Sequence, residues 1–510
     1  MPDPSPAAPR KHRFTRSFWM LNTIEMWERL AYYNLRVMAP IYIMQADDPG
    51  GLHLTAAHKG TIYAWWAIFQ SLLPIVTGGF ADRFGYKRVL GLSIFTMMLG
   101  YLMIAFARDL PGIDNFTSLF TAIMVLATGT AFFKPSIQGS LAQNLDKDNS
   151  SVGWGIFYWV VNVGAFVGHY LPGLLLTRDH SAASWRNLFI ASAAFTALNL
   201  LMLFTFKDVP SGADKRESVF SVLKRTFVNI AEPRLVAWLA IMSGFWLMTY
   251  QLWDLQPNFI KDWVDSSSLV RAISWLPESA LASLTEQTPR GLQIPQQVLL
   301  SLNSFCIILG VVGMAWLTRH MRTLTAMLGG MLLATVGLLI AGWTMNVWFL
   351  LLGIVFFSLG EMTTGPKKSE YLALIAPPGK KGLYLGYVNI PVGVGVFIGS
   401  KIAGYVYGHF GEKAVLAQKY LLQHTDLGAG KTWDGDPATL GTLLGVSRPD
   451  AFARLMETLH LDASAATTLL WNTYTPQYFV WIPFAAVGII SAIGLWIFGR
   501  MARRWSDMNA

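Results

Sequence analysis

About twelve apolar runs constrain the fold of this chain more than any other feature. They lie near residues 18–46, 56–80, 86–107, 117–143, 152–177, 184–206, 235–260, 295–318, 322–343, 346–373, 382–408 and 477–501. A helix of roughly 20 apolar residues spans the core of a bilayer, whereas a transmembrane barrel shows short alternating segments. Hydrophobic residues make up 53% of the 510 residues, and charged residues only 14%. The sequence therefore predicts an all-α, multi-pass membrane protein with about twelve transmembrane helices.

The basic residues indicate how these helices are oriented. Lys and Arg gather at every second join and at both ends of the chain: Lys11, Arg13, Arg16, Arg83, Lys87, Arg88, Lys215, Arg216, Lys224, Arg225, Arg319, Arg322, Lys380, Lys381, Arg500, Arg503 and Arg504. These positions share one side of the membrane if both termini are cytoplasmic, as the positive-inside rule requires. We therefore expect a plasma (inner) membrane protein with both termini in the cytoplasm. Because the basic residues lie in these loops, the net charge of +9 does not indicate nucleic-acid binding.

A polar, basic segment divides the helices six and six. The expected parts are a cytoplasmic tail at 1–17, an N-terminal bundle at 18–206, a cytoplasmic linker at 207–234, a C-terminal bundle at 235–501 and a second tail at 502–510. The C-terminal bundle carries two long outer loops, at 256–295 and 411–476. The second loop contains "PDAFARLMETLH", which predicts a small amphipathic helix. This loop either caps the outer mouth or is solvated and has no direct role.

The two halves show a weak internal repeat. The second and third helices are joined by "GGFADRFGYKR", and the equivalent join in the second half, "GMAWLTRHMR", keeps the position and a basic cluster. Parallel repeats of this kind are typical of secondary transporters, in which substrate binds near the midplane between the halves. In the first join, we expect Asp82 to accept hydrogen bonds at a helix end, and Arg83 to pair with acidic groups that separate when the halves move.

The stretch "EMWERLAYYNLR" places charges inside the first apolar run. At 100° per residue, six polar side chains fall within about 140° of one helix face: Glu25, Glu28, Arg29, Tyr32, Tyr33 and Arg36. A charge at the centre of such a helix costs roughly 2.5–3.5 kcal/mol on the insertion scale, so this stripe is expected to face the protein interior or a wet cavity. The alternative is a self-neutralised Glu25–Arg29 pair that only pins helices together.

Five further polar residues lie within the apolar runs. Lys134 is about ten residues, or roughly 15 Å, from the next polar loop, so it does not easily reach the interface. Glu361 either faces the interior or lies near a basic interface. Asn162 and Asn303 either bind a ligand or satisfy backbone groups between helices. Asp254, toward the outer end of its helix, is either part of a gate or salt bridge, or a solvated end residue.

The sequence also excludes several classes of function. It contains no nucleotide-binding P-loop, no metal-ligand cluster and no spacing typical of a nucleophile triad. Cys306 is the single cysteine, so the chain forms no internal disulfide. We therefore expect neither an enzyme nor a resident cofactor or metal, and we expect an ion gradient to supply the energy for transport.

Taken together, these motifs resemble the proton-dependent oligopeptide transporter family of the major facilitator superfamily. "EMWERLAYY" is similar to the ExxERFxYY motif of helix 1, and "GGFADRFGYKR" to the loop motif between helices 2 and 3. "FFKP" resembles the helix-4 lysine motif, and "FYWVVNVGAF" resembles FYxxINxGSL. "SLN" at 301–303 and "GE" at 360–361 resemble the matching points of helices 8 and 10. The resemblance covers most of the chain, excluding the tail and both long outer loops.

This resemblance implies a fold and a set of residue roles. The fold is that of the major facilitator superfamily, with two six-helix halves. By this resemblance, Arg29 and Lys134 would hold a peptide's carboxylate, with Tyr33 assisting. Tyr32 is a further candidate for substrate binding. The residues implied for the amino group are Asn162, Asn303 and Glu361. Those for proton coupling are Glu25, Glu28, Arg29 and Glu361, and Lys134 and Glu361 would also form a salt bridge between the halves. The further candidates for conformational change, from the residues themselves, are Asp82, Arg83 and Asp254.

The sequence thus predicts a proton-coupled symporter that imports di- and tripeptides by alternating access. Its partners would be a small peptide, protons and the lipid bilayer, and we expect it to work as a monomer. One alternative is a carrier of the same architecture for another charged small molecule, such as a peptide-like antibiotic, a cell-wall fragment or an anion. Another is a membrane sensor or scaffold that does not transport and binds a partner through the 411–476 loop.

Overall fold

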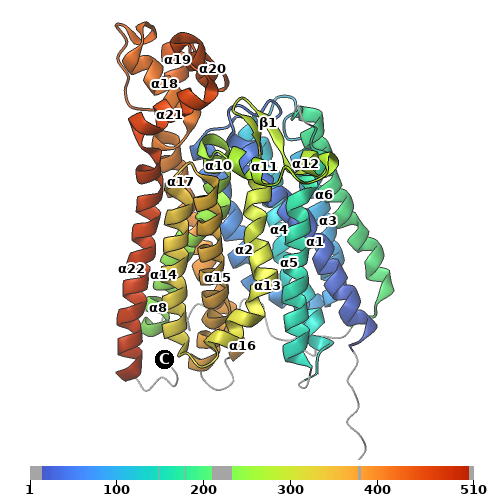
Figure 1. Cartoon of the computed structure of the whole chain (residues 1–510). Coiled ribbons are helices and arrows are strands. Elements are labelled where there is room, and N and C mark those ends of the chain that lie inside the picture. Colours follow the sequence, from blue (N-terminus) through green and yellow to red (C-terminus); the bar gives the residue numbers. More distant parts are fainter. Residues whose placement is uncertain (1–13, 147–148, 178–179, 209–231, 377–380, 505–510) are drawn as a thin grey trace, which may run out of the picture.

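A computed structural model describes residues 14–146, 149–177, 180–208, 232–376 and 381–504 (Figure 1). Parts of three predicted segments lie outside the described residues: most of the tail at 1–17, most of the linker at 207–234, and the last six residues of the tail at 502–510. Seven of the basic positions named above lie outside the described residues as well: Lys11, Arg13, Lys215, Arg216, Lys224, Arg225 and Lys380.

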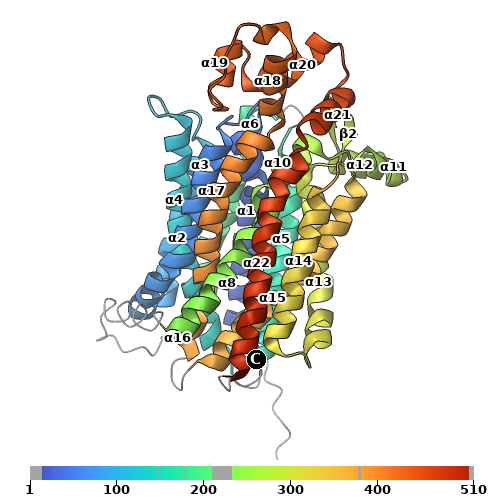
Figure 2. The same ribbon diagram turned by 90° about the vertical axis from the view of Figure 1, so that its left-hand side faces the viewer.

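Long helices run side by side along one axis of the molecule (Figures 1 and 2). Twelve of them form the body: α1 (Arg16–Met44), α2 (Ala56–Phe84), α3 (Tyr86–Ala105), α4 (Asn115–Gln143), α5 (Ser150–Leu175), α6 (Ala182–Met202), α8 (Pro233–Thr249), α13 (Gln296–Thr318), α14 (Thr323–Gly342), α15 (Val347–Ile375), α17 (Ile390–Phe410) and α22 (Pro476–Arg504). Within the described chain, ten segments are long and apolar enough to cross a membrane, and α1 and α5 run beside these ten in the same bundle. The predicted helical membrane fold with about twelve crossing helices is confirmed.

Local sequence signals set the ends of these helices. Thr15 caps α1 by accepting a hydrogen bond from the amide of Phe18, and Thr55 caps α2 in the same way. Gly85 alone separates α2 from α3, and its φ of 95° lies in the left-handed region that favours glycine. Asp82 accepts a hydrogen bond from the Tyr86 hydroxyl at 2.6 Å across this turn, as predicted.

Two crossing segments that the sequence predicts as single helices are interrupted. The run at 235–260 consists of α8, α9 (Gln251–Asp254) and α10 (Gln256–Trp263), and the run at 382–408 consists of α16 (Lys381–Gly386), a 3₁₀ turn at Tyr387–Asn389 and α17. Pro257 and Pro391 stand in the first turns of α10 and α17, where a proline is tolerated because the amide hydrogen that it lacks has no partner within the helix there. Irregular backbone at membrane depth is tolerated where it lines a cavity.

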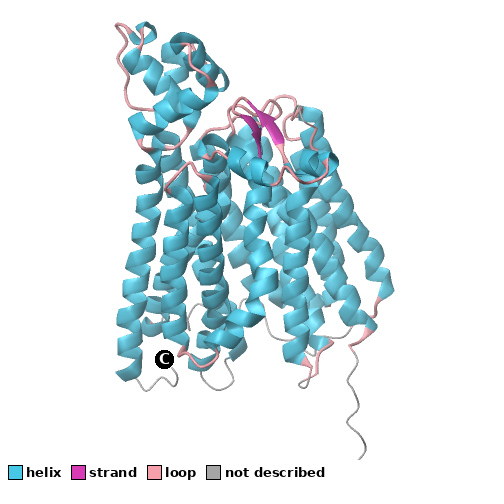
Figure 3. Cartoon of the chain, in the orientation of Figure 1, coloured by secondary structure: helices cyan, strands magenta, loops and turns pink. Residues whose placement is uncertain are grey.

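The two long outer loops are folded. The first contains α11 (Ser267–Ala272), α12 (Glu278–Leu284) and a hairpin of β1 (Glu286–Thr288) with β2 (Gly291–Gln293), so the chain is not purely α-helical. The second forms a helical cap of α18 (Lys413–His424), a 3₁₀ turn at Asp426–Gly428, α19 (Leu440–Leu444), α20 (Arg448–Leu459) and α21 (Ala463–Tyr474). The amphipathic helix predicted at "PDAFARLMETLH" is α20. Figure 3 shows how fully helix dominates the chain and where the hairpin lies.

The cap defines the two ends of the molecule. We call the end that carries α18–α21 the cap end, and the opposite end, where α1 begins and α22 ends, the terminal end (Figure 1). The N-terminal half (α1–α6) and the C-terminal half (α8–α22) meet mainly where α2 packs on α17 and α5 on α13. Near the cap end, a Cβ on Gly60 would lie 2.4 Å from the carbonyl oxygen of Ser400, and one on Gly404 would lie 2.7 Å from that of Ala56. The two helices therefore touch backbone to backbone, and the halves are closed at the cap end.

Candidate functional site

A cavity of about 590 Å³ lies between the two halves. Both halves contribute to its lining: Arg29, Tyr32, Tyr33, Arg36, Ala67, Gln70, Ser71, Pro74, Ile75, Lys134, Pro135, Gln138, Trp246, Thr249, Tyr250, Trp253, Glu361, Gly386, Tyr387, Asn389, Val392 and Val396. Thr249, Tyr250 and Trp253 come from the interrupted α8–α10 segment, and Tyr387 and Asn389 from the interruption before α17. The volume suits a small molecule, and polar groups converge on it from several helices.

The charged stripe of α1 faces the interior, as the sequence predicts. Glu25, Glu28 and Arg29 are buried, and Arg29 also lines the cavity. Arg29 Nε lies 3.2 Å from a carboxylate oxygen of Glu25, and the guanidinium also forms an ion pair with Glu28. The Arg29 guanidinium carbon lies 4.8 Å from the centre of the Tyr32 ring, and the Tyr32 hydroxyl donates to Gln70 Oε1 at 3.0 Å. The Glu25–Arg29 part of the stripe is therefore neutralised within α1, as the alternative interpretation expected, but the stripe also reaches the cavity.

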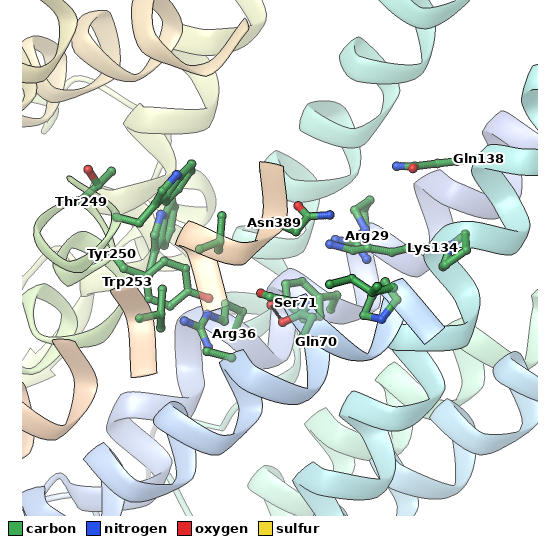
Figure 4. A pocket seen from close by; sticks show the side chains of 18 of the residues that line it. Arg29, Arg36, Gln70, Ser71, Lys134, Gln138, Thr249, Tyr250, Trp253 and Asn389 are labelled. Carbon is green, nitrogen blue, oxygen red and sulfur yellow. Dashed lines mark hydrogen bonds between the residues drawn. The ribbon is translucent and has the colours of Figure 1, made fainter. Parts of the chain in front are cut away.

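Lys134 and Glu361 line the cavity from opposite halves. Lys134 projects from α4 beside Arg29 (Figure 4), and within the described residues it forms neither an ion pair nor a hydrogen bond. Glu361 projects from α15 and accepts a hydrogen bond from Asn303 Nδ2 at 3.0 Å. The interfacial position considered for Glu361 is therefore wrong. The predicted inter-half salt bridge between Lys134 and Glu361 is not formed in this arrangement, which leaves one cation and one anion facing the same cavity.

The two predicted asparagines are placed differently from these charges. Asn303 does not line the cavity, but its amide bonds both Glu361 and Ser358 Oγ, each at 3.0 Å, and so orients the carboxylate. Asn162 does not line the cavity either, and its amide donates to the backbone oxygen of Tyr158 one turn earlier at 2.9 Å. The direct contact with an amino group predicted for both residues finds no support in this arrangement.

Asp254 forms a buried contact between the halves at the cap end. Its side chain and that of Lys59 are both fully buried, and Lys59 Nζ lies 3.0 Å from Asp254 Oδ1. Lys59 also donates to the backbone oxygen of Asp254 at 2.6 Å and to Asn258 Oδ1 at 3.1 Å. Ser400 Oγ donates to the other Asp254 oxygen at 2.5 Å. The interpretation of Asp254 as a solvated end residue is therefore wrong, and its contact is the salt bridge of the alternative.

Sequence reasoning missed several residues of this site. Lys59 stands in the first turn of its helix, where a lysine usually reaches water, so only the folded arrangement reveals its partner. Arg36 belongs to the predicted stripe but had no assigned role, and it lines the cavity beside Tyr250 (Figure 4).

Arg83, which was predicted to pair with acidic groups, lies away from the cavity at the terminal end. There, its guanidinium carbon is 5.8 Å from the centre of the Phe84 ring.

The described residues contain no group of three or more His, Cys, Asp or Glu side chains that could hold a metal ion. The chemistry visible in the cavity is that of charge and hydrogen bonding. Such groups can bind a small charged molecule and hold protons.

Comparisons with known proteins match this architecture. Residues 28–261 match the family model described as "Major Facilitator Superfamily". A crystal structure of "peptide transporter POT in complex with sulfate" superposes with a TM-score of 0.64 at 16% identity, covering 98% of this chain and 96% of that chain. A crystal structure of the "nucleoside transporter NupG" superposes with a TM-score of 0.62 at 12% identity, covering 95% of this chain and 99% of that chain. The chain therefore has the major facilitator fold, and the two solved structures that it resembles are described as transporters.

Sequence relatives narrow this class. The "Di-/tripeptide transporter" of Lactococcus lactis subsp. lactis (strain IL1403) is 29% identical over 163 residues, 31% of this chain and 32% of that protein. "Dipeptide and tripeptide permease A" of Erwinia pyrifoliae is 26% identical over 166 residues, 32% of each protein. "Multidrug resistance protein MdtH" of Proteus mirabilis is 24% identical over 347 residues, 67% of this chain and 75% of that protein. The matches span about a third of the peptide transporters, and they confirm the resemblance to the oligopeptide transporter family that the motifs indicate.

Proposed function

We propose that the protein is a proton-coupled symporter of di- and tripeptides that works by alternating access. The observation that supports this most directly is the placement of Lys134 on one half and Glu361 on the other, both facing one cavity. A peptide is a zwitterion, so its carboxylate suits Lys134 and Arg29, and its amino group suits Glu361. Binding both ends at once draws the halves together.

Glu25 and Glu28 are the candidates for proton coupling. Each carboxylate has one buried oxygen without a hydrogen-bond partner in the described structure, while its other oxygen contacts Arg29. A substrate carboxylate that competes for Arg29 changes the proton affinity of these glutamates. By linkage, protonation changes substrate affinity by the same factor. The further parts of the proposal are that the terminal end faces the cytoplasm, that the membrane is the plasma membrane, and that a monomer suffices.

The test is uptake of radiolabelled dialanine into proteoliposomes under an imposed inward proton gradient. We expect gradient-driven uptake by the parent and its loss in Glu28→Gln and in Glu361→Gln. A matched control is Glu370→Gln, because Glu370 lies on the same helix as Glu361 but is half exposed and pairs with Lys367 at 2.9 Å. Uptake should persist in this control. A folded parent without peptide-stimulated proton movement would refute the proposal.

A second candidate is a carrier of the same fold for another charged small molecule. The match to a multidrug resistance protein over 67% of this chain favours it, because the peptide transporters match a shorter part. Glu361 separates the two candidates, since an anion carrier has no use for a carboxylate opposite Lys134. Uptake of dialanine that is unchanged in Glu361→Gln would count against the role assigned to Glu361, and a folded parent without dialanine uptake would favour the second candidate.

A further inference from the structure

Arg36 is a buried cation that lacks a carboxylate partner. It is 3% exposed, and within the described residues it forms no ion pair within 4.0 Å. Its guanidinium carbon lies 4.4 Å from the centre of the Tyr63 ring, 4.7 Å from Trp66 and 4.6 Å from Tyr250. Its Nη2 atom is buried and has no hydrogen-bond partner in the described structure. Three aromatic faces therefore hold the guanidinium in place without neutralising it.

Two other cations near the cavity, Arg29 and Lys59, are paired, whereas Lys134 shares with Arg36 the lack of an ion pair within the described residues. Arg29, two helical turns away, contacts both Glu25 and Glu28. Asp254, on the C-terminal half, acts electrostatically on Arg36, but its carboxylate is already engaged by Lys59 and Ser400. The protein thus supplies counter-charges to these neighbours and leaves Arg36 open toward the cavity that it lines.

The energetics favour an anion at this position. An ion without a partner in a buried site carries a large desolvation cost. Each cation–π contact offsets part of this cost, so the three rings lower it without removing it. A carboxylate that entered the cavity would offset more, because the guanidinium can present two parallel N–H donors to it. The aromatic rings also fix the guanidinium in one orientation, which lowers the entropy lost on binding.

The position of Arg36 defines which group of a ligand it can reach. Seven residues separate Arg36 from Arg29 on α1, a rise of roughly 10 Å. Figure 4 shows Arg36 beside Tyr250, with Arg29 and Lys134 together at the other side of the cavity. On the proposed function, Arg29 with Lys134 and Glu361 take the two charged ends of a peptide backbone. Arg36 therefore remains for a third charge, at a separate place in the same cavity.

We propose that Arg36 selects substrates with a second carboxylate, namely small peptides that carry an acidic side chain. This inference rests on the proposed function, because it assumes that the peptide termini occupy the Lys134 and Glu361 sides. A neutral side chain of the same shape leaves the Arg36 guanidinium unpaired, so the discrimination comes from one charge-assisted contact.

The test compares the binding of Ala-Glu, Ala-Gln and Ala-Ala to the purified full chain by isothermal titration calorimetry. A hydrogen-bonded contact to a charged group makes a substantial contribution to affinity, so we expect Ala-Glu to bind at least about tenfold more tightly than Ala-Gln. In Arg36→Gln this ratio should fall to about one. Arg36→Lys keeps the charge but loses the two-pronged contact, and an intermediate ratio is expected. Melting temperatures identify any variant that fails to fold.

A matched control removes a positive charge elsewhere. Arg186 lies at the cap end, is 37% exposed in its side chain and pairs with Asp109, so Arg186→Gln should keep the parent ratio. Equal affinities of the parent for Ala-Glu and Ala-Gln would overturn the inference alone. Equal losses for all three peptides in Arg36→Gln would overturn it too, because Arg36 would then hold the common carboxyl terminus. If the folded parent bound none of the three, the proposed function would fail as well.

Discussion

The buried Lys59–Asp254 pair should control which end of the transporter is closed. The pair joins α2 of one half to α9 of the other, and both side chains are fully buried. Removing one partner of a buried ion pair costs about 3–5 kcal/mol, because the other charge stays buried without a counter-charge. The contact requires the two halves to be together at the cap end, so this cost falls on the closed arrangement. A loss of about 3 kcal/mol shifts the equilibrium between closed and open cap ends by about 150-fold.

Double electron–electron resonance can measure this shift. The spin labels are attached at Ile113 on the N-terminal half and at Trp275 on the C-terminal half. Both positions are exposed and lie at the cap end. Cys306→Ser removes the native cysteine, so that only these two positions are labelled. In Lys59→Met we expect the short distance between the labels to give way to a longer one.

Two comparisons separate the ion pair from other effects. Lys401→Met removes an exposed lysine of α17 that donates to Thr61 of α2 at 2.8 Å, also between the two halves, and should leave the distance distribution unchanged. The double variant Lys59→Met with Asp254→Leu removes both charges and should restore much of the short distance, because apolar replacement of a whole buried pair is often neutral. If Lys59→Met keeps the parent distribution, the pair does not hold the halves together and the reasoning is wrong.

Two further perturbations test the closed cap end. Arg448 of the cap donates to the backbone oxygens of Met44, at the end of α1, and of His53 and Leu54 in the α1–α2 loop. In Arg448→Ala, hydrogen exchange should accelerate at 45–55, whereas Arg454→Ala, on the exposed face of α20, should change nothing. Equal protection of 45–55 in both variants would contradict a latching role for Arg448. Gly404→Val should open the cap end in the same spin-label assay, because overpacking at the contact with Ala56 costs about 1–3 kcal/mol. The control Gly313→Val places its side chain in open space and should leave the distance distribution unchanged.

Sequence reasoning located the polar residues that face the cavity better than it located their partners. The periodicity of α1 placed Glu25, Glu28 and Arg29 on an interior face, because a helix that spans a membrane must hide its charges. The same rule found Lys134 and Glu361. It did not find the Lys59–Asp254 pair, because the two residues are 195 positions apart and each stands near a helix end, where water is the usual partner.

The helix interruptions show a different kind of miss. Pro257 and Pro391 are visible in the sequence, but a proline alone does not predict a break here, because Pro74 and Pro135 stand inside uninterrupted helices. The aromatic enclosure of Arg36 is not accessible from the sequence either, because Tyr63 and Trp66 come from α2 and Tyr250 comes from the opposite half. Periodicity assigns a residue to a face, but it does not say which face of another helix lies opposite.

On the proposed function, the charges of the two halves indicate what a ligand contributes when one closed end is exchanged for the other. At the cap end, opposite charges from the two halves are already paired, as Lys59 and Asp254 show. In the cavity, Lys134 and Glu361 come from opposite halves and are not paired, so the approach of the halves is favoured either by their direct pairing or by a zwitterion that bridges them. Moving a two-state equilibrium from about 1:99 to about 99:1 requires about 5.5 kcal/mol of differential binding. The loss of one buried pair is about 3–5 kcal/mol, so a zwitterion that engages both charges in the second arrangement supplies an energy of the same order.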